Sequence, residues 1–265
     1  MRIAPGTRAL VTGASRGIGR ALAERLAARG AVVGLAARSE GELRALAERL
    51  PGSHHALACD VGDRASMERT LAAFVAQAGG IDLLVANAGV AAYGPFSSTP
   101  FERAEEMTRI NWLGTLHTVH AGLPPLLEQG AGHVVIVSSG AALRSFPQAA
   151  VYGATKAAQR AFAEALRHEL SGTGVSLTTV YPGEIATSLH DHEKSTMPAW
   201  YRGGSDAVPA ARMAQKILAG VEADARAVHF PPLVRALAVA QGLSPRLADR
   251  LLRALRGESA APRRD

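Results

Sequence analysis

Short apolar runs, many of them β-branched, alternate along this chain with longer stretches whose apolar residues recur at helical spacing. This alternation predicts a parallel sheet that is covered by helices on both faces. Seven runs are expected to form strands, at residues 9–12, 31–36, 55–59, 81–86, 133–138, 175–180 and 227–230. The helical stretches lie near residues 17–29, 40–50, 63–78, 100–129, 149–170 and 208–222.

Strands that are joined by helices follow right-handed crossovers, so the pattern predicts an α/β fold with a Rossmann-like, doubly wound sheet of about seven strands. No internal repeat and no linker rich in proline, glycine or serine interrupts the pattern. We therefore expect one domain at residues 1–230, with residues 231–265 as a C-terminal helical extension of the same domain. In such a fold, ligands bind at the carboxyl ends of the strands.

The net charge of +6 comes almost wholly from arginine, and seven arginines against three acidic residues put +4 of it in residues 231–265. No motif typical of nucleic-acid binding accompanies this charge, so we expect no nucleic-acid partner. The single cysteine, Cys59, excludes an intramolecular disulfide and fits a reducing compartment. The chain runs directly into a strand and has no apolar stretch of about 18 residues, so we expect a cytoplasmic protein without a signal peptide.

Three glycines follow the first expected strand and open the first helix, in the run Thr-Gly-Ala-Ser-Arg-Gly-Ile-Gly at residues 12–19. Gly13, Gly17 and Gly19 would permit a tight turn whose backbone N–H groups, together with the helix N-terminus, favour a phosphate. Their spacing differs from the common G-x-G-x-x-G fingerprint. On spacing alone, a glycine-rich turn without a ligand stays an alternative.

A proton-transfer group is indicated by Tyr152 and Lys156, which lie four residues apart on an expected helix and therefore share one face. The pKa of an isolated phenol is about 10, and we expect the neighbouring ammonium to lower it. Ser139 lies thirteen residues before the tyrosine, just past a strand, where its hydroxyl can polarise a substrate oxygen. Alternation along the strand points Ser138 to the opposite side.

These motifs, together with Asn-Ala-Gly at residues 87–89, Asn111 and Pro-Gly-x-x-x-Thr at residues 182–187, resemble the short-chain dehydrogenase/reductase family over residues 7 to about 230. The resemblance implies an enzyme that interconverts a carbonyl compound and an alcohol with a nicotinamide cofactor. It implies catalytic roles for Asn111, Ser139, Tyr152 and Lys156. The cofactor-binding residues that it implies are Gly13, Ser15, Arg16, Gly17, Ile18, Gly19, Arg38, Asp60, Val61, Asn87, Ala88, Gly89, Tyr152, Lys156, Pro182, Gly183, Ile185 and Thr187.

The same resemblance implies individual roles for some of these residues. Asp60 is implied to bind the adenine amino group, with a backbone contact from Val61 beside it, and Thr187 the nicotinamide carboxamide. Asn111 is implied to hold a water that links the lysine of the proton-transfer group to solvent. For Asn87 we expect either a place near the adenine ribose or a structural role in the sheet.

Cofactor choice depends on the end of the second strand, where a carboxylate would accept from the NAD ribose and repel the 2′-phosphate of NADP. This chain has Ala37 there, followed by Arg38, while Arg16 lies in the glycine loop. Two guanidinium groups can hold a phosphate through charge-assisted hydrogen bonds, and the resemblance implies a preference for NADP(H). The alternative is that both arginines are solvated surface residues.

The substrate site is expected to form from residues 93–96, 143–148 and 185–206. The large apolar side chains of these segments are Tyr93, Phe96, Leu143, Phe146, Leu189, Met197, Trp200 and Tyr201. They predict a largely apolar pocket under a mobile lid, and hence an apolar ketone or aldehyde as substrate. The alternative is that they pack the lid itself or a dimer surface. The run His-Asp-His-Glu at residues 190–193 is expected to be a polar loop, and no metal site is expected.

The C-terminal extension departs from the family pattern. Pro231 and Pro232 lead into an apolar helix, and Ser244 with Pro245 can cap and start a second one. The second helix would carry an apolar stripe flanked by arginines, the stripe being Leu247, Leu251, Leu252 and Leu255. We expect it to pack on its own subunit or in a dimer, with peripheral contact to an anionic membrane as the alternative.

The expected assembly is a homodimer through the helices at residues 100–129 and 149–170, or a homotetramer. The function expected from the sequence is that of an NADPH-dependent carbonyl reductase. Two other interpretations stay open, namely a protein that binds NADP(H) as a sensor or scaffold without turnover and a membrane-surface protein. The intact set of proton-transfer residues argues against the first of these.

Overall fold

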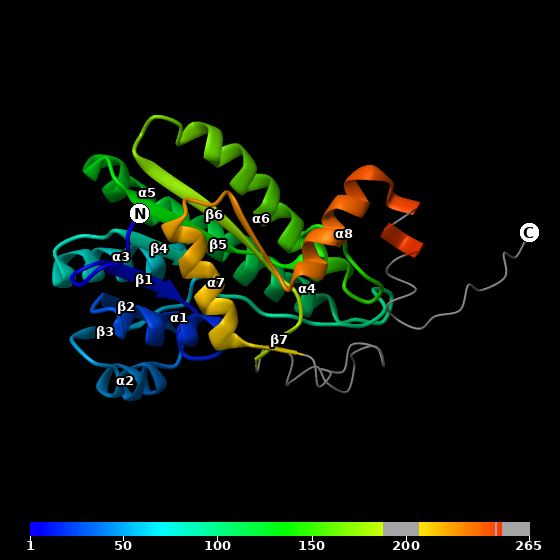
Figure 1. Cartoon of the computed structure of the whole chain (residues 1–265). Helices are drawn as coiled ribbons and strands as arrows, with labels where there is room; N and C mark the ends of the chain where they lie inside the picture. Colours follow the sequence, from blue (N-terminus) through cyan, green and yellow to red (C-terminus); the bar gives the residue numbers. More distant parts are fainter. Residues whose placement is uncertain (188–206, 247, 251–265) are drawn as a thin grey trace, which may run out of the picture.

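The computed structural model describes residues 1–187, 207–246 and 248–250, and its centre is a sheet of seven parallel strands (Figure 1). The strands are β1 (Arg8–Thr12), β2 (Val32–Ala37), β3 (His54–Ala58), β4 (Leu83–Ala86), β5 (Gly132–Val137), β6 (Val175–Pro182) and β9 (Ala227–Phe230). Their order in the sheet is β3-β2-β1-β4-β5-β6-β9. The predicted doubly wound sheet is confirmed, and each expected strand agrees with the structure to within two residues at either end.

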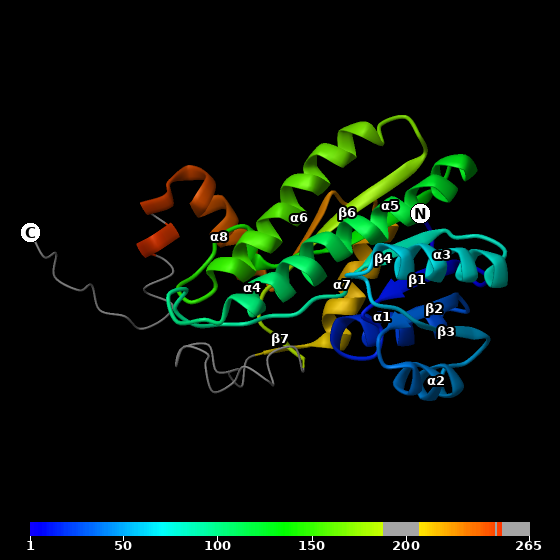
Figure 2. The same cartoon turned by 180° about the vertical axis from the view of Figure 1, so that it is seen from behind.

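Helices cover both faces of the sheet, as Figures 1 and 2 show from opposite sides. One face carries α1 (Gly17–Ala27), α2 (Glu40–Arg49) and α7 (Ala210–Glu222). The other face carries α3 (Arg64–Ala78), α5 (Gly114–Gln129) and α6 (Ala150–Glu169). Successive strand residues point to opposite faces, so Leu83 and Val85 of β4 join the first core while Leu84 and Ala86 join the second. Because helices exclude water from both faces of the sheet, residues of either face are apolar, which accounts for the nearly continuous apolar runs of the central strands.

The strand order places the crevice of the fold beside β1. This strand pairs with β2 on one side and β4 on the other, so the chain winds outward in opposite directions from it. At such a reversal the connections leave the sheet on opposite faces, and the carboxyl ends of the two central strands open onto a gap. The loops after β1 and β4 are therefore in position to bind a ligand.

The helix that was expected over residues 100–129 is interrupted. It consists of α4 (Phe101–Met107), a six-residue π-helix η1 (Thr108–Leu113) and then α5. In η1 the N–H of Gly114 bonds to the carbonyl of Arg109, five residues earlier, so the turn holds one residue more than an α-helical turn. Hydrophobic periodicity does not register a single widened turn, and the expectation of one continuous helix was wrong.

Two small elements and the start of α7 also differ from expectation. β7 (Ile185–Ala186) pairs with β8 (Val208–Pro209), and both strands are too short to carry an alternating pattern. The helix expected from residue 208 begins at Ala210, because Pro209 and the residue before it belong to β8. A short 3-10 helix, η2 (Gly140–Ala142), follows β5.

The extension begins with α8 (Pro232–Leu243), the apolar helix that the sequence predicts. Residues 245, 246 and 248–250 are helical as well, which agrees with a second helix starting near Ser244. The leucine stripe expected on that helix lies outside the described residues. Within the described parts of the chain, no helix is both long and apolar enough to cross a membrane.

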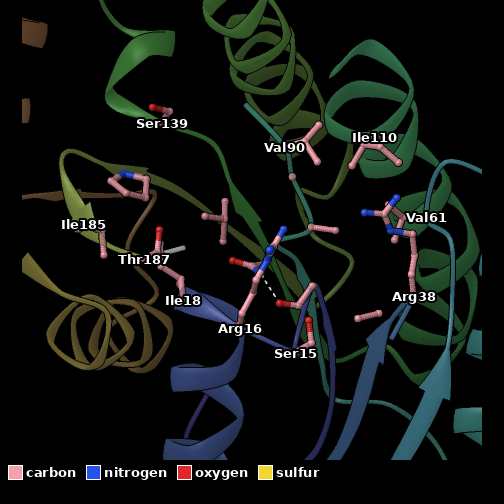
Figure 3. A pocket seen from close by; sticks show the side chains of 18 of the residues that line it. Ser15, Arg16, Ile18, Arg38, Val61, Val90, Ile110, Ser139, Ile185 and Thr187 are labelled. Carbon is pink, nitrogen blue, oxygen red and sulfur yellow. Dashed lines mark hydrogen bonds between the residues drawn. The ribbon is translucent and has the colours of Figure 1, made fainter. Parts of the chain in front are cut away.

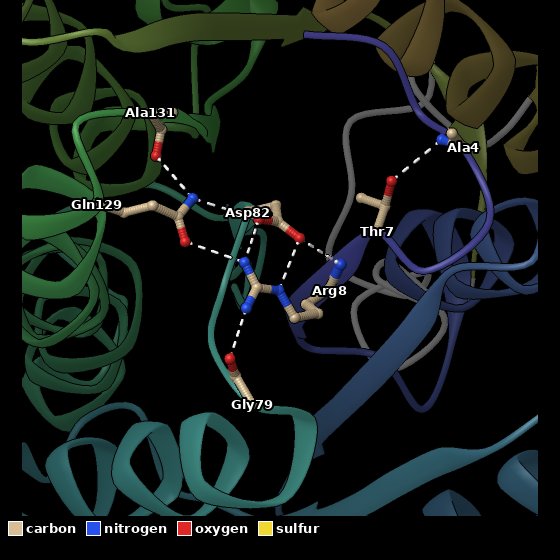
Figure 4. A network of polar contacts seen from close by, with 7 residues as sticks. All are labelled: Ala4, Thr7, Arg8, Gly79, Asp82, Gln129 and Ala131. Atoms are coloured by element: carbon tan, nitrogen blue, oxygen red, sulfur yellow. Dashed lines mark hydrogen bonds and ion pairs between the residues drawn. The ribbon is translucent and has the colours of Figure 1, made fainter.

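A polar network joins the amino ends of the central strands, at the end of the sheet that lies opposite the crevice (Figure 4). The guanidinium of Arg8 donates to both carboxylate oxygens of Asp82, with Nε 2.9 Å from Oδ2, and to Oε1 of Gln129 at 2.9 Å. Burial raises the pKa of Asp82, but the hydrogen bonds from Arg8 outweigh burial and hold the pKa below its ordinary value. The network ties the start of β1 to the start of β4 and to the end of α5.

Candidate active site

A cavity of about 270 Å³ lies at the carboxyl ends of the strands, in the crevice beside β1 (Figure 3). Its lining contains every residue expected in the site except Gly19 and Asn111. The expected residues that line it are Gly13, Ser15, Arg16, Gly17, Ile18, Arg38, Asp60, Val61, Asn87, Ala88, Gly89, Ser139, Tyr152, Lys156, Pro182, Gly183, Ile185 and Thr187. Residues that are as far apart in the sequence as Gly13 and Thr187 thus line one cavity.

The glycine loop after β1 has the conformation that its composition predicts. Gly13 and Gly17 adopt φ values of +66° and +57°, which L side chains rarely adopt. A Cβ on Gly13 would lie 2.9 Å from the Cα of Ala88, so the loop can lie against the end of β4 only without a side chain. Gly19 stands behind the loop, where a Cβ would overlap the carbonyl of Gly13, which explains why it does not line the cavity.

The N-terminus of α1 is open toward the cavity. Its N-cap residue, Arg16, makes no side-chain cap hydrogen bond, and the first turn contains no acidic residue. The first N–H groups of the helix therefore keep their hydrogen-bonding capacity and the positive end of the helix dipole is not neutralised locally. An anionic group such as a diphosphate fits this place.

Figure 3 shows Arg38 and Val61 at one end of the cavity and Ser139, Ile185 and Thr187 at the other, with Arg16 between them. No acidic residue occupies the end of β2, because position 37 is an alanine. Two polar residues of this region were not expected in the lining, Ser39 and Glu42, the latter in the first turn of α2. A scan of the residues that follow β2 into the first helical turn would have found them.

Asp60 is held by a residue that sequence reasoning missed. Its Oδ2 accepts from Nη1 of Arg109 at 2.8 Å, and its Oδ1 accepts from the backbone N–H of Gly62 at 2.9 Å. Burial raises the pKa of Asp60, but these hydrogen bonds and the charges of Arg109 and Arg38 lower it below its ordinary value. Asp60 is therefore an ionised, oriented carboxylate at the Arg38 end of the cavity.

Asn87 joins β4 to the glycine loop. Its Nδ2 donates to the carbonyl of Thr12 at 2.8 Å, and its backbone N–H donates to Oγ1 of the same threonine at 3.0 Å. These bonds link the ends of the two central strands. The structural role that was one of two expectations for Asn87 is therefore present in the structure, while the residue also lines the cavity.

Tyr152 and Lys156 lie on one face of α6, as their spacing predicts, with Nζ 5.8 Å from the centroid of the phenol ring. The ammonium donates to the carbonyl of Val137 at 3.2 Å. Ser139 stands at the end of β5, where its Oγ accepts from the N–H of Ala141 and caps η2. Ser138 was expected to point to the opposite side but also lines the cavity, and its hydroxyl is engaged by donating to the carbonyl of Lys156 at 2.9 Å.

Burial dominates the electrostatics of this group. It raises the pKa of Tyr152, with a hydrogen bond from Ser139 acting in the opposite direction, and it lowers the pKa of Lys156 to about 8. The expected lowering of the Tyr152 pKa by the ammonium is therefore not found. The physical reason is that the phenol is removed from water and the ammonium itself carries a cost of desolvation.

Asn111 lies in η1, fully buried behind the cavity wall. Its side chain exchanges two hydrogen bonds with the backbone of Val90, at 2.8 and 3.0 Å, and donates to Oγ1 of Thr155 at 3.1 Å. A Cβ on Gly89 would lie 3.2 Å from Oδ1 of Asn111 and 3.5 Å from Nζ of Lys156, so the amide and the ammonium both lie beside that glycine.

The loop after β6 closes the cavity on the Ser139 side. A Cβ on Gly17 would lie 3.3 Å from the side chain of Thr187, which places this threonine against the glycine loop of β1. Gly183 donates its N–H to the carbonyl of Phe230 at 2.8 Å, which ties the loop to the end of β9. The expected contact of Thr187 with a cofactor stays a prediction.

Only part of the expected substrate segments reaches the site. Tyr93 stacks on Phe146, with ring centroids 6.0 Å apart, and lies 5.8 Å from the ring of Tyr152. Phe96 is 63% exposed and lines a separate hollow of about 280 Å³ together with Phe101, so it does not reach the cavity beside Tyr152. Leu143 does not line the cavity and packs instead against the cluster of Ala142, Tyr181 and Val234. The other expected residues lie outside the described residues, namely Leu189, Met197, Trp200, Tyr201 and the polar run at 190–193.

Comparisons with known proteins agree with this arrangement. The family model of the short chain dehydrogenases matches residues 7–198. An uncharacterized oxidoreductase of Staphylococcus epidermidis is 36% identical over 181 residues, which cover 68% of this chain and 79% of the relative.

Two solved structures share the fold over most of their length. A short chain dehydrogenase/reductase from Burkholderia phymatum, in complex with NAD, is 26% identical and has a TM-score of 0.85 over 93% of this chain and 96% of its own. An alcohol dehydrogenase from Thermococcus sibiricus, complexed with 5-hydroxy-NADP, is 27% identical and has a TM-score of 0.72 over 84% of this chain and 94% of its own.

Proposed function

This chain belongs to the short-chain dehydrogenase/reductase family, and we propose that it interconverts a carbonyl compound and an alcohol with NADP(H) as cofactor. The observation that carries the proposal is one cavity in which the glycine loop after β1 meets Ser139, Tyr152 and Lys156. One end of that cavity can bind a dinucleotide and the other can move a proton. Both are needed for carbonyl redox chemistry at neutral pH.

The residues of the cavity fit a nicotinamide dinucleotide. The side-chain-free approach at Gly13 and Gly17 and the open N-terminus of α1 suit a diphosphate, and the ionised Asp60 suits a hydrogen-bond donor such as an adenine amino group. Thr187 faces the glycine loop from the opposite side. When bound there, such a cofactor would supply or accept the hydride at the substrate carbon.

The cofactor that we propose is NADP(H). Arg38 and Arg16 both line the cavity, and the end of β2 carries an alanine in place of a carboxylate. A phosphomonoester on the ribose would gain charge-assisted hydrogen bonds from these guanidinium groups. Solved relatives include proteins crystallised with either form of the cofactor, so the preference of this chain rests on its own arginines.

In the proposed reduction, Tyr152 donates its phenolic proton to the substrate oxygen while the Ser139 hydroxyl donates a hydrogen bond to the same atom. Burial keeps the phenol protonated, which is the form that reduction requires. The Lys156 ammonium, whose pKa burial lowers to about 8, can return a proton to the tyrosine. Asn111, whose side chain lies beside the same glycine as that ammonium, would support the relay to solvent.

The proposed substrate is a small apolar ketone or aldehyde. Next to Tyr152 the described wall consists of Tyr93 and Phe146, whose rings stack on each other and leave an apolar surface beside the phenol. An apolar substituent on the carbonyl compound would be removed from water there, while its oxygen meets the hydroxyl groups.

The test is NADPH consumption over a panel of apolar and polar carbonyl compounds, with Tyr152→Phe measured in parallel and NADPH affinity determined separately for each protein. The variant keeps the ring and its packing, so we expect unchanged affinity and loss of turnover. Tyr181→Phe is the control, because it removes a hydroxyl from a buried tyrosine outside the cavity. Turnover that survives in Tyr152→Phe would contradict the proton-donor role, and tight binding without turnover in every protein would favour a sensor of NADP(H).

The assembly that we propose is a homodimer or homotetramer through α5 and α6. Leu113, just before α5, and Leu127, near its end, are 39% and 40% exposed, and Trp112 lies edge-on against Phe162 of α6. Light scattering on the purified protein would measure the mass directly. A monomer at micromolar concentration would contradict the proposal.

A second candidate function, peripheral contact with an anionic membrane, is favoured by the outer face of α8. Leu233, Val239 and Leu243 are 43%, 55% and 76% exposed there, and Arg235 lies on the same helix. Such a face can insert at the boundary between headgroups and acyl chains. Cosedimentation of the full chain with anionic vesicles, lost on Val239→Glu, would support it. Equal recovery with and without vesicles would exclude it.

A further inference from the structure

The C-terminal extension packs directly on the two loops that border the catalytic side of the cavity. A Cβ on Gly183 would lie 2.8 Å from Cδ of Pro231 and 2.9 Å from Cγ2 of Val234. A Cβ on Gly140 would lie 3.4 Å from Cγ1 of the same valine. Val234 in the first turn of α8 is therefore inserted between the loop after Ser139 and the loop after β6, at two places that have no side chain of their own.

This contact is a small core of its own. Val234 is 6% exposed and packs with Ala142 and Tyr181, and the partly buried Leu143 lies against the cluster. Ala142 belongs to η2, whose first residue follows Ser139 directly. The 3-10 turn that the catalytic serine caps is thus covered on one side by the extension.

A second contact joins the same loop to residues farther along the extension. Arg144, five residues after Ser139, forms an ion pair with Asp249, although the two are 105 residues apart in the sequence. The side chains are 28% and 36% exposed, and Ala248 beside the aspartate is fully buried. Nε of Arg144 is buried and has no hydrogen-bond partner among the described residues. Among the described residues, Asp249 is therefore the group that compensates the partly desolvated guanidinium.

The backbone of Arg144 is continuous with the turn that holds Ser139. Its N–H donates to the carbonyl of Gly140 at 3.1 Å, and the N–H of Ala141 donates to Oγ of Ser139 at 3.1 Å. A shift at Arg144 is therefore transmitted through one helical turn to the serine hydroxyl. Displacements of about 1 Å at a reacting group are enough to cost about a hundredfold in rate.

We propose that the Arg144–Asp249 ion pair is a clasp by which the C-terminal extension holds the Ser139 loop in its productive position. Arg144 and Asp249 are thus positioning residues, and neither lines the cavity. The proposal rests on the proposed function for its kinetic consequence, because a productive position has meaning only if Ser139 meets a substrate. Its structural consequence, an ordered loop at residues 139–146, can be measured without any substrate.

The test compares Asp249→Asn with Asp249→Glu in the full chain. Asparagine keeps the size and removes the charge, whereas glutamate keeps the charge. We expect Asp249→Asn to lower kcat about tenfold with the Kd for NADPH changed by less than about twofold, and Asp249→Glu to keep most of the rate. The matched control is Glu164→Gln, which breaks the exposed pair with Arg160 on α6.

Hydrogen–deuterium exchange of residues 139–146 provides the second measurement. We expect faster exchange of this segment in Asp249→Asn, with exchange of β1 and β4 unchanged, because only the loop loses its anchor. If no carbonyl compound is turned over by any protein, this measurement still decides on the clasp, and the failure is then one of the proposed function alone. Unchanged exchange of the segment in Asp249→Asn, or an equal loss of rate in Asp249→Glu, would overturn the clasp.

Discussion

Replacing Lys156 by methionine should stabilise the fold while it abolishes activity. The ammonium is 4% exposed and donates to the Val137 carbonyl, and burial lowers its pKa from 10.5 to about 8. At neutral pH the lysine is charged in both the folded and the unfolded chain, but only the folded chain bears the cost of desolvating the charge. Methionine has a similar length and flexibility and carries no charge, so the variant avoids that cost.

The size of the effect follows from the two pKa values. A difference of one pKa unit corresponds to about 1.4 kcal/mol, so the lowering from 10.5 to about 8 costs the folded state about 3 kcal/mol at pH 7. Loss of the hydrogen bond to Val137 takes back about 1 kcal/mol. The free energy of unfolding of Lys156→Met should therefore exceed that of the wild type by about 2 kcal/mol at pH 7.

The sign of the pH dependence is fixed by the direction of the shift. Because the folded-state pKa is the lower one, the wild type gains stability as the pH rises from about 8 to 10.5, where the folded lysine is neutral while the unfolded lysine still binds a proton. The advantage of the variant should shrink through this window, reach zero at about pH 9.5, and become a deficit of about 1 kcal/mol near the upper end, where only the lost hydrogen bond to Val137 remains. Urea unfolding followed by circular dichroism at pH 7, 8.5 and 10 measures it.

The matched control is Lys216→Met, which removes an exposed lysine on α7. Its ammonium lies 5.8 Å from the centroid of the Phe230 ring, so the control should change the free energy of unfolding by less than about 1 kcal/mol, and by the same amount at every pH. A Lys156→Met protein that is less stable than the wild type at pH 7, or whose difference from it does not depend on pH, would refute the reasoning. In that case the ammonium would be better solvated than its burial indicates.

Three further changes test other parts of the site and the fold. Arg38→Asp should weaken NADPH binding by at least about tenfold and favour NADH, because it replaces a charge that attracts the phosphate by one that repels it. If the ratio of the KM values for NADPH and NADH does not change, Arg38 does not bind the phosphate. The Gly13→Ala protein should no longer bind NADPH in titration calorimetry. The control is Gly6→Ala, at a similar φ of +84° but with nothing within 4 Å of the added Cβ; this protein should be less stable but still bind NADPH. Burial lowers the pKa of His133 from 6.5 to about 4, so between pH 7 and 5 the unfolded chain binds a proton at this histidine while the folded chain does not. Over this range the free energy of unfolding of the wild type should therefore fall by about 2 kcal/mol more than that of His133→Gln. His120→Gln, at an exposed position, should follow the wild type, and identical pH profiles for all three proteins would contradict the burial argument.

The sheet and most of the site could be predicted because their signals are local. β4 and β5 are nearly continuous apolar runs, and a strand that is buried on both faces needs no more than that. Tyr152 and Lys156 could be paired from their spacing on one helix, and Gly13 from the turn between a strand and a helix. In each case the residues that define the feature lie within a few positions of one another.

The features that the sequence did not predict are pairings between distant segments. Arg109 and Asp60 are 49 residues apart, and either charge could equally have been solvated, so nothing in the local pattern favours their contact. The pKa of Tyr152 also depends on how completely the folded chain covers the phenol, which spacing along a helix does not report. The widened turn of η1 shifts the helix by one residue without changing the order of apolar and polar positions.

That widened turn has a consequence for how this chain could be altered. Three successive residues of η1 serve three parts of one cavity: Arg109 holds the carboxylate of Asp60, Ile110 forms the wall, and Asn111 reaches the backbone beside the ammonium. Deleting one residue of η1 would restore a regular helix and rotate its neighbours by about 100°. The contacts of Arg109 with Asp60 and of Asn111 with Val90 would then be lost together. In a chimera between relatives, η1 should therefore be exchanged as one block together with residues 60 and 90.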